Sequence, residues 1–181
     1  MKEGFYFMQK VAKFYKVSSY QYIGSNKRSE ENYQKKLQEW EDIKLPQRAT
    51  DGSAGYDFFS PIDFKLHAHN TIKIPTGIRV EILEDGWFLG TFPKSGLGFK
   101  YRLQLDNTLG IIDQDYFYSD NEGHIFAKIT NDTYEGKCLE IKKGEPFIQG
   151  IFLPFGITID DEDYPKQKRN GGFGSTNKHI I

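Results

Sequence analysis

The sequence predicts an all-β domain with a jelly-roll-like arrangement of strands, and two observations support that prediction. Gly, Tyr and Phe occur 18, 11 and 15 times in 181 residues, a composition typical of many short strands joined by tight turns. Short apolar runs also follow one another along the chain, each bounded by Gly, Asn, Asp or Lys-Gly, at the spacing of sandwiches and barrels. A chain of this length is expected to bury a proper core as one domain.

The N-terminal part is expected to contain one strand and one inserted helix. Residues 11–22 are rich in Tyr, Phe and Val and lack Gly and Pro, which predicts a first strand. In residues 25–44, Ser29 is a suitable helix N-cap, and apolar side chains recur at helical spacing before Pro46. These side chains are Tyr33, Leu37 and Trp40. We expect this amphipathic helix to dock on its own subunit through that stripe.

The remaining strands are predicted from alternation and from the turn residues that flank them. Apolar and polar residues alternate on both sides of Pro75-Thr76-Gly77, a pattern typical of two strands with one buried face. Further short strands are expected at 87–92, 103–105, 125–129, 138–141 and 147–155. Residues 160–181 lack apolar periodicity and are expected to form a mobile C-terminal arm. The predicted organisation is a β domain over residues 1–159, with the helical insertion near 25–44, followed by this arm.

The charge balance and the cysteine content exclude several classes of function. The 24 Lys and Arg residues nearly match the 25 Asp and Glu residues, so no bulk attraction to nucleic acid or to an anionic membrane is expected. Cys138 is the single cysteine, which excludes an intramolecular disulfide and fits a reducing compartment. The N-terminal apolar run is too short for a signal peptide, and no run approaches the ~20 residues of a membrane span. We therefore expect a cytoplasmic protein.

Residues 110–116 carry the strongest chemical signal. They place Asp113 and Asp115 behind an apolar strand, where alternation would set both carboxylates on one face and Tyr116 on the other unless the chain turns. A close pair of carboxylates is costly in a core, which favours a chemical role. A calcium-binding loop is the alternative, but the two residues after Tyr116 are aromatic, where that loop needs an oxygen ligand and a glycine.

Two stretches are suited to bind phosphate through backbone N–H groups and positive side chains. Lys94, Ser95 and Gly96 place a cation, a hydroxyl and a flexible backbone directly after a strand. Residues 168–176 of the tail also combine cations, hydroxyls and a flexible backbone, and Phe173 stands among their glycines. An apolar ring is wasted in a linker but useful as a lid over a base. Neither stretch has the Gly-Lys-Ser/Thr ending of a Walker A loop.

Five short stretches occur in an order that is specific to one family. They are Ala54-Gly55-Tyr56-Asp57, Pro93-Lys94-Ser95-Gly96-Leu97-Gly98, Gly110-Ile111-Ile112-Asp113-Gln114-Asp115-Tyr116, Phe147-Ile148-Gln149-Gly150-Ile151 and Gly171-Gly172-Phe173-Gly174-Ser175-Thr176. Over residues 45–176 this series resembles the five motifs of the trimeric dUTPase family. The resemblance implies the jelly-roll-like barrel of that family and a dUTP diphosphatase activity, which converts dUTP to dUMP and pyrophosphate.

The resemblance also implies a role for each matching residue. Asp113 would be the general base that activates the water attacking the α-phosphate. Mg²⁺ would be held chiefly by the phosphates and by waters, with Asp57 acting through water only. Tyr116 would pack on the deoxyribose and exclude a 2′-hydroxyl, while main-chain groups of the hairpin at 105–112 would read uracil. The implied substrate-binding residues are Lys94, Ser95, Gly96, Asn107, Gly110, Ile111, Ile112, Tyr116, Gln149, Lys168, Arg169, Phe173, Gly174 and Ser175.

The family's C-terminal arm and a few departures from its motifs complete the expectation. An arm from a neighbouring subunit would lay Phe173 over the uracil, so a homotrimer with three shared sites is implied. Lys94 and Pro146 stand where the family usually has arginine, and Lys94 loses the bidentate fork, which predicts weaker phosphate binding. Lys168 replaces another arginine and Arg169 follows it, so either of the two could meet the γ-phosphate.

Two other functions compete with the hydrolase. A dCTP deaminase shares the fold, but the intact segment at 112–116 is the water-activating segment of the hydrolase. A non-catalytic dUTP-binding regulator could use the helix at 25–44 as a partner surface, and the complete set of carboxylates argues against that alternative. The sequence therefore predicts an enzyme that acts on dUTP.

Overall fold

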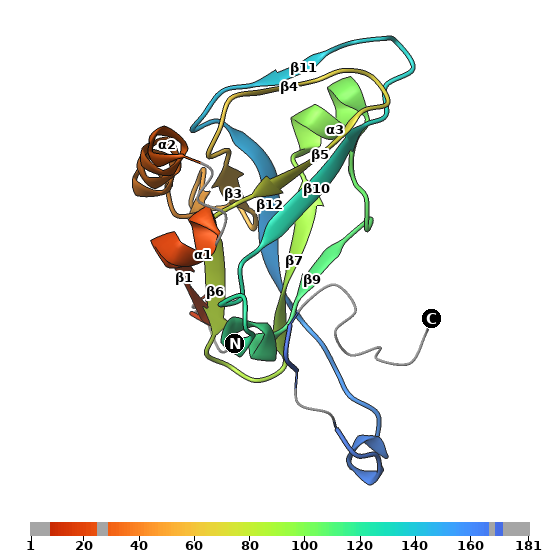
Figure 1. Cartoon of the computed structure of the whole chain (residues 1–181). Helices are drawn as coiled ribbons and strands as arrows, with labels where there is room; N and C mark the ends of the chain where they lie inside the picture. Colours follow the sequence, from red (N-terminus) through yellow and green to blue (C-terminus); the bar gives the residue numbers. More distant parts are fainter. Residues whose placement is uncertain (1–7, 25–28, 167–168, 172–181) are drawn as a thin grey trace, which may run out of the picture.

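The computed structural model describes residues 8–24, 29–166 and 169–171, and it confirms the predicted all-β class (Figure 1). The largest sheet has the order β2-β3-β12-β7-β9, and a second sheet has the order β5-β10-β8. Two further pairs are β11-β4 and β1-β6, and every pairing is antiparallel. The fold is jelly-roll-like, with the glycine-rich and polar connections that the composition predicts.

The strands that were predicted occur in the structure, with bounds within one or two residues of the predicted ranges. The predicted strands are β5 (Thr71–Pro75), β6 (Ile78–Ile82), β7 (Trp87–Pro93), β8 (Leu103–Leu105), β10 (Phe126–Asn131), β11 (Leu139–Ile141) and β12 (Pro146–Pro154). The apolar strand expected before Asp113 is β9 (Gly110–Ile112). Strands that were not predicted are β2 (Gln47–Arg48), β3 (Tyr56–Phe59) and β4 (Phe64–Leu66). Each of these is four residues or shorter, too short for an alternating pattern to be recognised.

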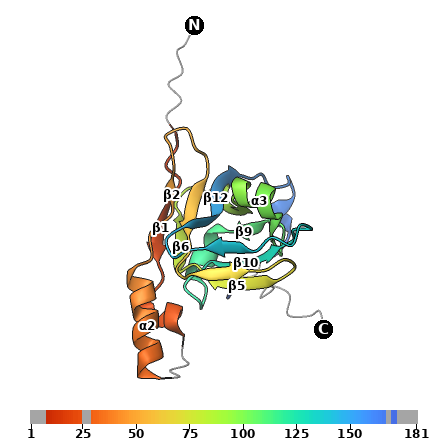
Figure 2. The ribbon, with the colours of Figure 1, turned by 90° about the horizontal axis from the view of Figure 1, so that it is seen from above.

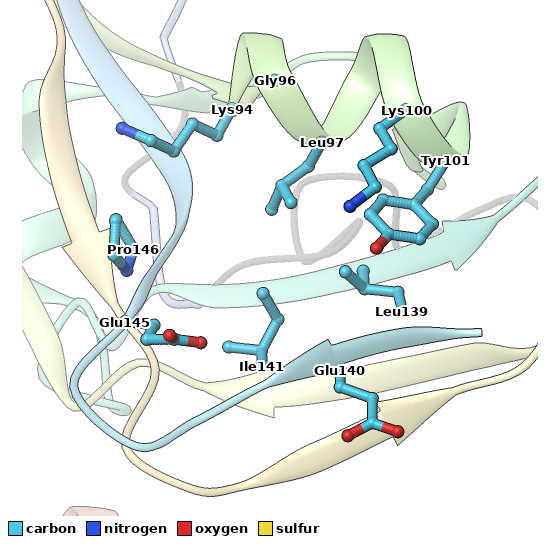
Figure 3. A pocket seen from close by; sticks show the side chains of 10 residues that line it. All are labelled: Lys94, Gly96, Leu97, Lys100, Tyr101, Leu139, Glu140, Ile141, Glu145 and Pro146. Carbon is cyan, nitrogen blue, oxygen red and sulfur yellow. The ribbon is translucent and has the colours of Figure 1, made fainter. Parts of the chain in front are cut away.

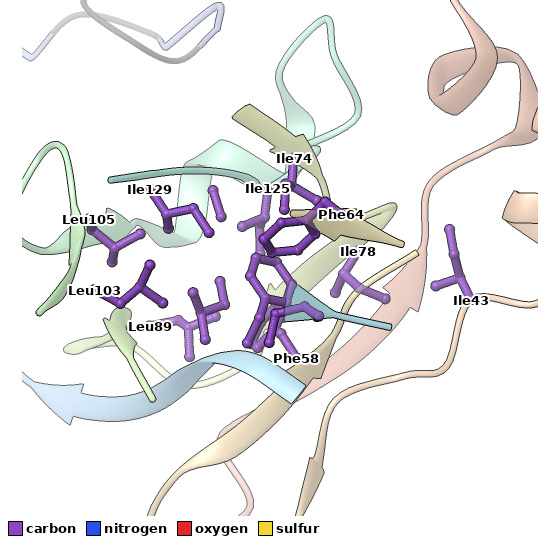
Figure 4. Packing of buried hydrophobic residues seen from close by; sticks show 14 of the residues in the cluster. Ile43, Phe58, Phe64, Ile74, Ile78, Leu89, Leu103, Leu105, Ile125 and Ile129 are labelled. Atoms are coloured by element: carbon purple, nitrogen blue, oxygen red, sulfur yellow. The ribbon is translucent and has the colours of Figure 1, made fainter. Parts of the chain in front are cut away.

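The core lies between the two larger sheets (Figure 4). Phe58 of β3 and Leu89 of β7 are fully buried on one side, and Ile74 of β5 and Ile129 of β10 are fully buried on the other. Each such side chain contributes about 1.5–3 kcal/mol through removal of apolar surface from water. This shared core holds β7, β9 and the elements around them in one rigid arrangement.

The prediction of a single strand over residues 11–22 was wrong in its second half. Strand β1 (Ala12–Lys16) pairs with β6, but a short helix, α1 (Ser19–Ile23), follows it. Ser18 caps this helix, because its Oγ accepts a hydrogen bond from the Gln21 N–H at 3.1 Å. Capping by Ser outweighed the β propensity of the tyrosines in this stretch.

The predicted inserted helix is confirmed as α2 (Glu30–Glu41), with the Ser29 Oγ accepting from the Asn32 N–H as N-cap. Figure 2 shows α2 next to α1, beyond the end of β1 and to one side of the β body. Trp40 fastens it there, since its Nε1 donates to the Val17 carbonyl at 2.8 Å and its ring packs against the core. The helix therefore docks on its own chain, and of the expected stripe Trp40 makes this contact.

Two helical turns were not predicted, and both lie beside the expected site residues. They are α3 (Ser95–Tyr101) and the 3₁₀ turn η1 (Gln114–Tyr118). Two glycines inside α3 lower its intrinsic helix propensity, so the tertiary context decides its formation. A last 3₁₀ turn, η2 (Asp161–Asp163), lies in the expected arm, whose predicted mobility stays a prediction. Among the described residues, no helix is long and apolar enough to cross a membrane.

Candidate active site

The two carboxylates of the strongest sequence signal meet one arginine. Strand β9 ends at Ile112, and the chain turns into η1 directly after Asp113. Arg169 lies between the carboxylates: its Nη2 is 2.5 Å from Asp113 Oδ2, and its Nε is 2.8 Å from Asp115 Oδ1. Because the chain turns, Asp113 and Asp115 are not spaced by strand alternation, and they converge on the guanidinium instead.

Asp113 is in an environment that makes it a stronger base than an ordinary carboxylate. Burial raises the pKa of Asp113 above its usual 3.8, the nearby Arg169 opposes that rise, and the Asp115 charge adds to it. The side chain is still 43% exposed, so water reaches it. A carboxylate with a raised pKa and access to water suits proton abstraction.

A pocket of about 290 Å³ lies beside these carboxylates. Its size is at the lower end of the range for small-molecule sites. Six of the implied substrate-binding residues line it: Asn107, Gly110, Ile111, Ile112, Tyr116 and Arg169. The sequence analysis missed its other lining residues, which are Thr91, Leu105, Ile125 and Phe126. Strand residues such as these carry no signal that separates a pocket wall from a core.

Gly110 lets the hairpin that lines this pocket approach β7. A Cβ at this position would stand 2.2 Å from Thr91 Oγ1, far inside ordinary contact. Thr91 is buried and directly opposite Gly110 in the β7–β9 register, and its hydroxyl donates to the Gly110 carbonyl at 3.4 Å. Glycine is therefore required here by the close approach of the two strands, and no positive φ is involved.

Tyr116 forms a buried wall of the pocket and is held by its hydroxyl. The ring is 6% exposed. Its hydroxyl donates to the His124 carbonyl at 2.8 Å and accepts from the Asn121 Nδ2 at 2.8 Å. Both partners belong to the loop after η1, so the position of the ring depends on that loop.

A second group of implied residues gathers around β3 and β12, away from the β9 edge of the large sheet. Lys94 Nζ binds both carboxylate oxygens of Asp57, at 2.7 and 2.8 Å. Gln149 lies opposite Asp57 in the β12–β3 register, and its Nε2 donates to the Pro93 carbonyl at 3.1 Å. Ser95 and Gly96 are exposed at the start of α3. A cation, a hydroxyl and an amide thus lie together, as phosphate binding requires.

The helix α3 also borders a hollow of about 350 Å³, which Lys94 and Gly96 line with residues of β11. Figure 3 shows Leu97 and Ile141 pointing toward one another across it, while Lys94 extends outward from the start of α3. Pro146, which replaces an arginine of the implied motif, lies at the same hollow. Its place at the start of β12 is one where proline is tolerated.

In one chain the two groups stay apart. Asp57 of β3 and Gly110 of β9 lie on strands separated by β12 and β7, so about 14 Å separates them at the usual strand spacing. The linings of the two hollows share no residue among those that the structure describes. Four implied residues, Lys168, Phe173, Gly174 and Ser175, lie outside the described residues.

Comparison with known proteins identifies what the arrangement resembles. The sequence model of one protein family, described as dUTPase, matches residues 41–177. A deoxyuridine 5'-triphosphate nucleotidohydrolase of Lactococcus lactis is 40% identical over 142 residues, covering 74% of this chain and 88% of the relative. The corresponding protein of Psychromonas ingrahamii is 37% identical over 143 residues, covering 76% and 90%.

Solved structures agree in fold. The dUTPase of Streptococcus mutans has a TM-score of 0.59 and 29% identity, covering 80% of this chain and 97% of that one. A dUTPase from phage phi11 of S. aureus, described with a structural Mg(II) ion, has a TM-score of 0.53 and 21% identity over 74% of this chain and 94% of that one. At that identity the second likeness concerns the fold alone.

Proposed function

The chain belongs to the dUTPase family and hydrolyses dUTP to dUMP and pyrophosphate, and we propose that it does so at the pocket beside Asp113. The observation that supports this location is the placement of Asp113. Its carboxylate has a raised pKa and stands beside a pocket lined by a buried tyrosine and a glycine-containing hairpin. A base next to a small pocket is the arrangement that hydrolysis of a bound nucleotide needs.

Asp113 acts as the general base in this proposal. Its carboxylate accepts a proton from a water whose oxygen forms a bond to the α-phosphorus. The bond from the α-phosphorus to its bridging oxygen breaks, and pyrophosphate leaves with that oxygen. The raised pKa supports the role, because proton transfer is most effective when the pKa of the base approaches the working pH. Arg169 must leave Asp113 first, since a carboxylate paired with a guanidinium is a weaker base.

The pocket binds the nucleoside. Tyr116 packs on the deoxyribose and leaves no room for a 2′-hydroxyl, and two hydrogen bonds hold its ring in place for that contact. Asn107, Gly110, Ile111 and Ile112 belong to the hairpin that lines the same pocket. Main-chain groups of this hairpin read uracil, and the close approach at Gly110 sets how far they reach into the pocket.

The second group binds the phosphate chain. Lys94 supplies the positive charge, and Ser95, Gly96 and Gln149 supply hydrogen bonds. The donor set also fits Mg²⁺, because Asp57 offers a carboxylate that is 15% exposed as an oxygen acceptor for the waters of that ion. When bound, Mg²⁺ neutralises charge on the triphosphate. Asp57 would orient a metal-bound water once Lys94 turns from it to the phosphates.

The two groups complete one site between subunits of a homotrimer. Their separation within one chain supports this assembly, since no single chain brings Lys94 and Asp57 beside Asp113. The C-terminal arm adds Lys168, Arg169, Phe173, Gly174 and Ser175, and the ring of Phe173 covers the uracil. Either Lys168 or Arg169 supplies the cation for the γ-phosphate; Arg169 pairs with Asp113 and Asp115 in this chain, and Lys168 lies outside the described residues. We also propose a cytoplasmic enzyme, because Cys138 is a free thiol and free thiols persist in reducing compartments.

Release of pyrophosphate from dUTP, dCTP, dTTP and UTP, measured in parallel with and without Mg²⁺, tests this proposal. We expect rapid release from dUTP alone, and only with Mg²⁺. The rival deaminase would instead release ammonia from dCTP. An absence of release from all four nucleotides would support the non-catalytic regulator.

A further inference from the structure

The loop that follows η1 is bound to the N-terminal segment of the chain. Ser18, the N-cap of α1, donates twice to the Glu122 carboxylate, from its N–H at 2.8 Å and from its Oγ at 2.6 Å. Burial alone would raise the pKa of Glu122, but these two hydrogen bonds, together with the nearby charge of Arg79, outweigh it and hold the pKa below its usual range. Glu122 is therefore ionised at neutral pH and makes charge-assisted hydrogen bonds with Ser18.

Glu122 has a backbone conformation that needs support. Its φ is +57°, a value uncommon for residues other than glycine. The glycine that follows it, Gly123, also has a positive φ, and a Cβ there would stand 2.8 Å from the Phe117 backbone. The loop thus doubles back tightly on η1, and the Ser18 contact holds it at the turn.

His124, next along this loop, connects the same two regions through Gly77. Burial lowers the pKa of His124 to about 4, so its imidazole is neutral and its Nε2 accepts from the Gly77 N–H at 2.9 Å. The Gly77 carbonyl in turn accepts from the Val17 N–H at 3.0 Å. The Tyr22 ring of α1 lies 6.2 Å from the imidazole, so helix α1 also covers this histidine.

The two contacts between this loop and the N-terminal segment, through Glu122 and through His124, both bear on Tyr116. Its hydroxyl donates to the main-chain carbonyl of His124, and Asn121, the residue before Glu122, donates to that hydroxyl. On the far side of η1, the Arg79 guanidinium lies 3.6 Å over the Phe117 ring and donates to the Phe117 carbonyl. The tyrosine expected to select the sugar therefore rests on a loop whose outer face is held by residues 17–22.

The supporting segment lies before the residues that the dUTPase family model matches. The dUTPase family match begins at residue 41, whereas β1 and α1 lie before it. We propose that this N-terminal segment positions Tyr116 for sugar selection, with Ser18 and Glu122 as the positioning residues that transmit the constraint. The inference rests on the role proposed above for Tyr116, and it assigns a specificity function to residues outside the five motifs.

A purely structural role is the competing explanation, and selectivity distinguishes the two. Loss of a merely stabilising contact would lower the melting temperature and leave the preference for dUTP over UTP unchanged. Loss of a positioning contact would let the Tyr116 ring move, so that a 2′-hydroxyl is better tolerated. Coupling of this kind changes a ratio of kcat/KM values by about three- to tenfold.

The experiment compares full-length variants by kcat/KM for dUTP and for UTP. Ser18→Ala removes the hydroxyl, Ser18→Thr keeps it, and Glu122→Ala removes the carboxylate. Tyr15→Phe is the matched control, because it deletes one hydrogen bond of the same N-terminal segment, to Glu81 at 2.8 Å, and keeps the ring that lies 5.9 Å from Phe117. Amide hydrogen exchange over residues 114–124 reports loop order independently of catalysis.

We expect the dUTP/UTP ratio to fall about three- to tenfold in Ser18→Ala and Glu122→Ala. Exchange over residues 114–124 should rise in the same two variants, while Ser18→Thr and Tyr15→Phe keep the wild-type values. Unchanged ratios in both alanine variants would overturn the inference. Tyr116→Ala, measured beside them, separates the two proposals: if that variant also keeps the ratio, the sugar role of Tyr116 is wrong, and if it alone changes the ratio, only the positioning role is wrong.

Discussion

Substitution of Gly110 by alanine tests whether the close approach of β9 to β7 shapes the pocket. The added Cβ would stand 2.2 Å from the Thr91 Oγ1, whereas ordinary contacts begin at 3.4 Å, so the two strands must separate by about 1 Å. Thr91 is 4% exposed and β-branched, which leaves its side chain little freedom to rotate away. Overpacking of this kind costs about 1–3 kcal/mol.

The consequence for activity follows from the position of the hairpin. Gly110 lines the pocket together with Asn107 and Ile111, so a displacement of about 1 Å would move the groups that read uracil and lower kcat/KM for dUTP by about 10- to 100-fold. The stability of Gly110→Ala should be measured by urea unfolding at one fixed protomer concentration, because the stability of an oligomer depends on concentration.

A double-mutant cycle with Thr91→Ala isolates the clash. Without the Thr91 hydroxyl, Gly110→Ala should cost far less, giving a coupling energy of about 1–3 kcal/mol. Gly98→Ala is the matched control, since nothing lies within 4 Å of a Cβ at that helical position, and it should stabilise the protein by about 0.5–1 kcal/mol. The reasoning is refuted if Gly110→Ala unfolds at the wild-type urea concentration or if its cost is the same with and without Thr91.

Three further predictions concern the carboxylates and the phosphate group. Asp113→Asn should lower kcat by about 10²–10⁴-fold while a non-hydrolysable dUTP analogue binds as before by calorimetry; an unchanged kcat would remove Asp113 from the mechanism. Because the pKa of Asp113 is raised above 3.8 and Arg169 opposes that rise, activity should fall as pH drops through the raised value, and Arg169→Ala should shift this acid limb to higher pH. The measurement is the pH profile of kcat/KM. If its acid limb moves to lower pH or does not move, the Arg169–Asp113 contact does not control the pKa of Asp113. Lys94→Ala should raise KM for dUTP about tenfold, the worth of one charge-assisted hydrogen bond, whereas Lys94→Arg should keep or improve it; equal values in steady-state assays would exclude Lys94 from phosphate binding.

Sequence patterns predicted the elements whose signals are local. Strands β5 and β6 were predicted because apolar residues alternate across several positions, and α2 because a capping serine precedes a helical stripe. Helix α1 was mistaken for strand because its cap was read as part of a β-rich run. Helix α3 was missed because two of its residues are glycines. In both cases neighbouring elements decide between states that differ little in local free energy.

The pocket likewise contains residues that the motifs predicted and residues that only the structure shows. The motifs predicted Asn107, Gly110 and Tyr116 as neighbours, and the structure brings them to one pocket. Thr91 and Phe126 line it too, yet nothing in their sequence context separates them from ordinary strand residues. The turn at Asp113 was open in the sequence, because strand alternation and a 3₁₀ turn are both compatible with the same residues.

The sequence by itself determined the all-β class, the inserted helix and the family, since these depend on composition, periodicity and motif order along the chain. Only the tertiary structure decided which distant residues meet. Arg169 reaches Asp113 across 56 positions, and Ser18 reaches Glu122 across 104. Such contacts arise from the packing of whole elements around a shared core, and no local pattern of side chains specifies them.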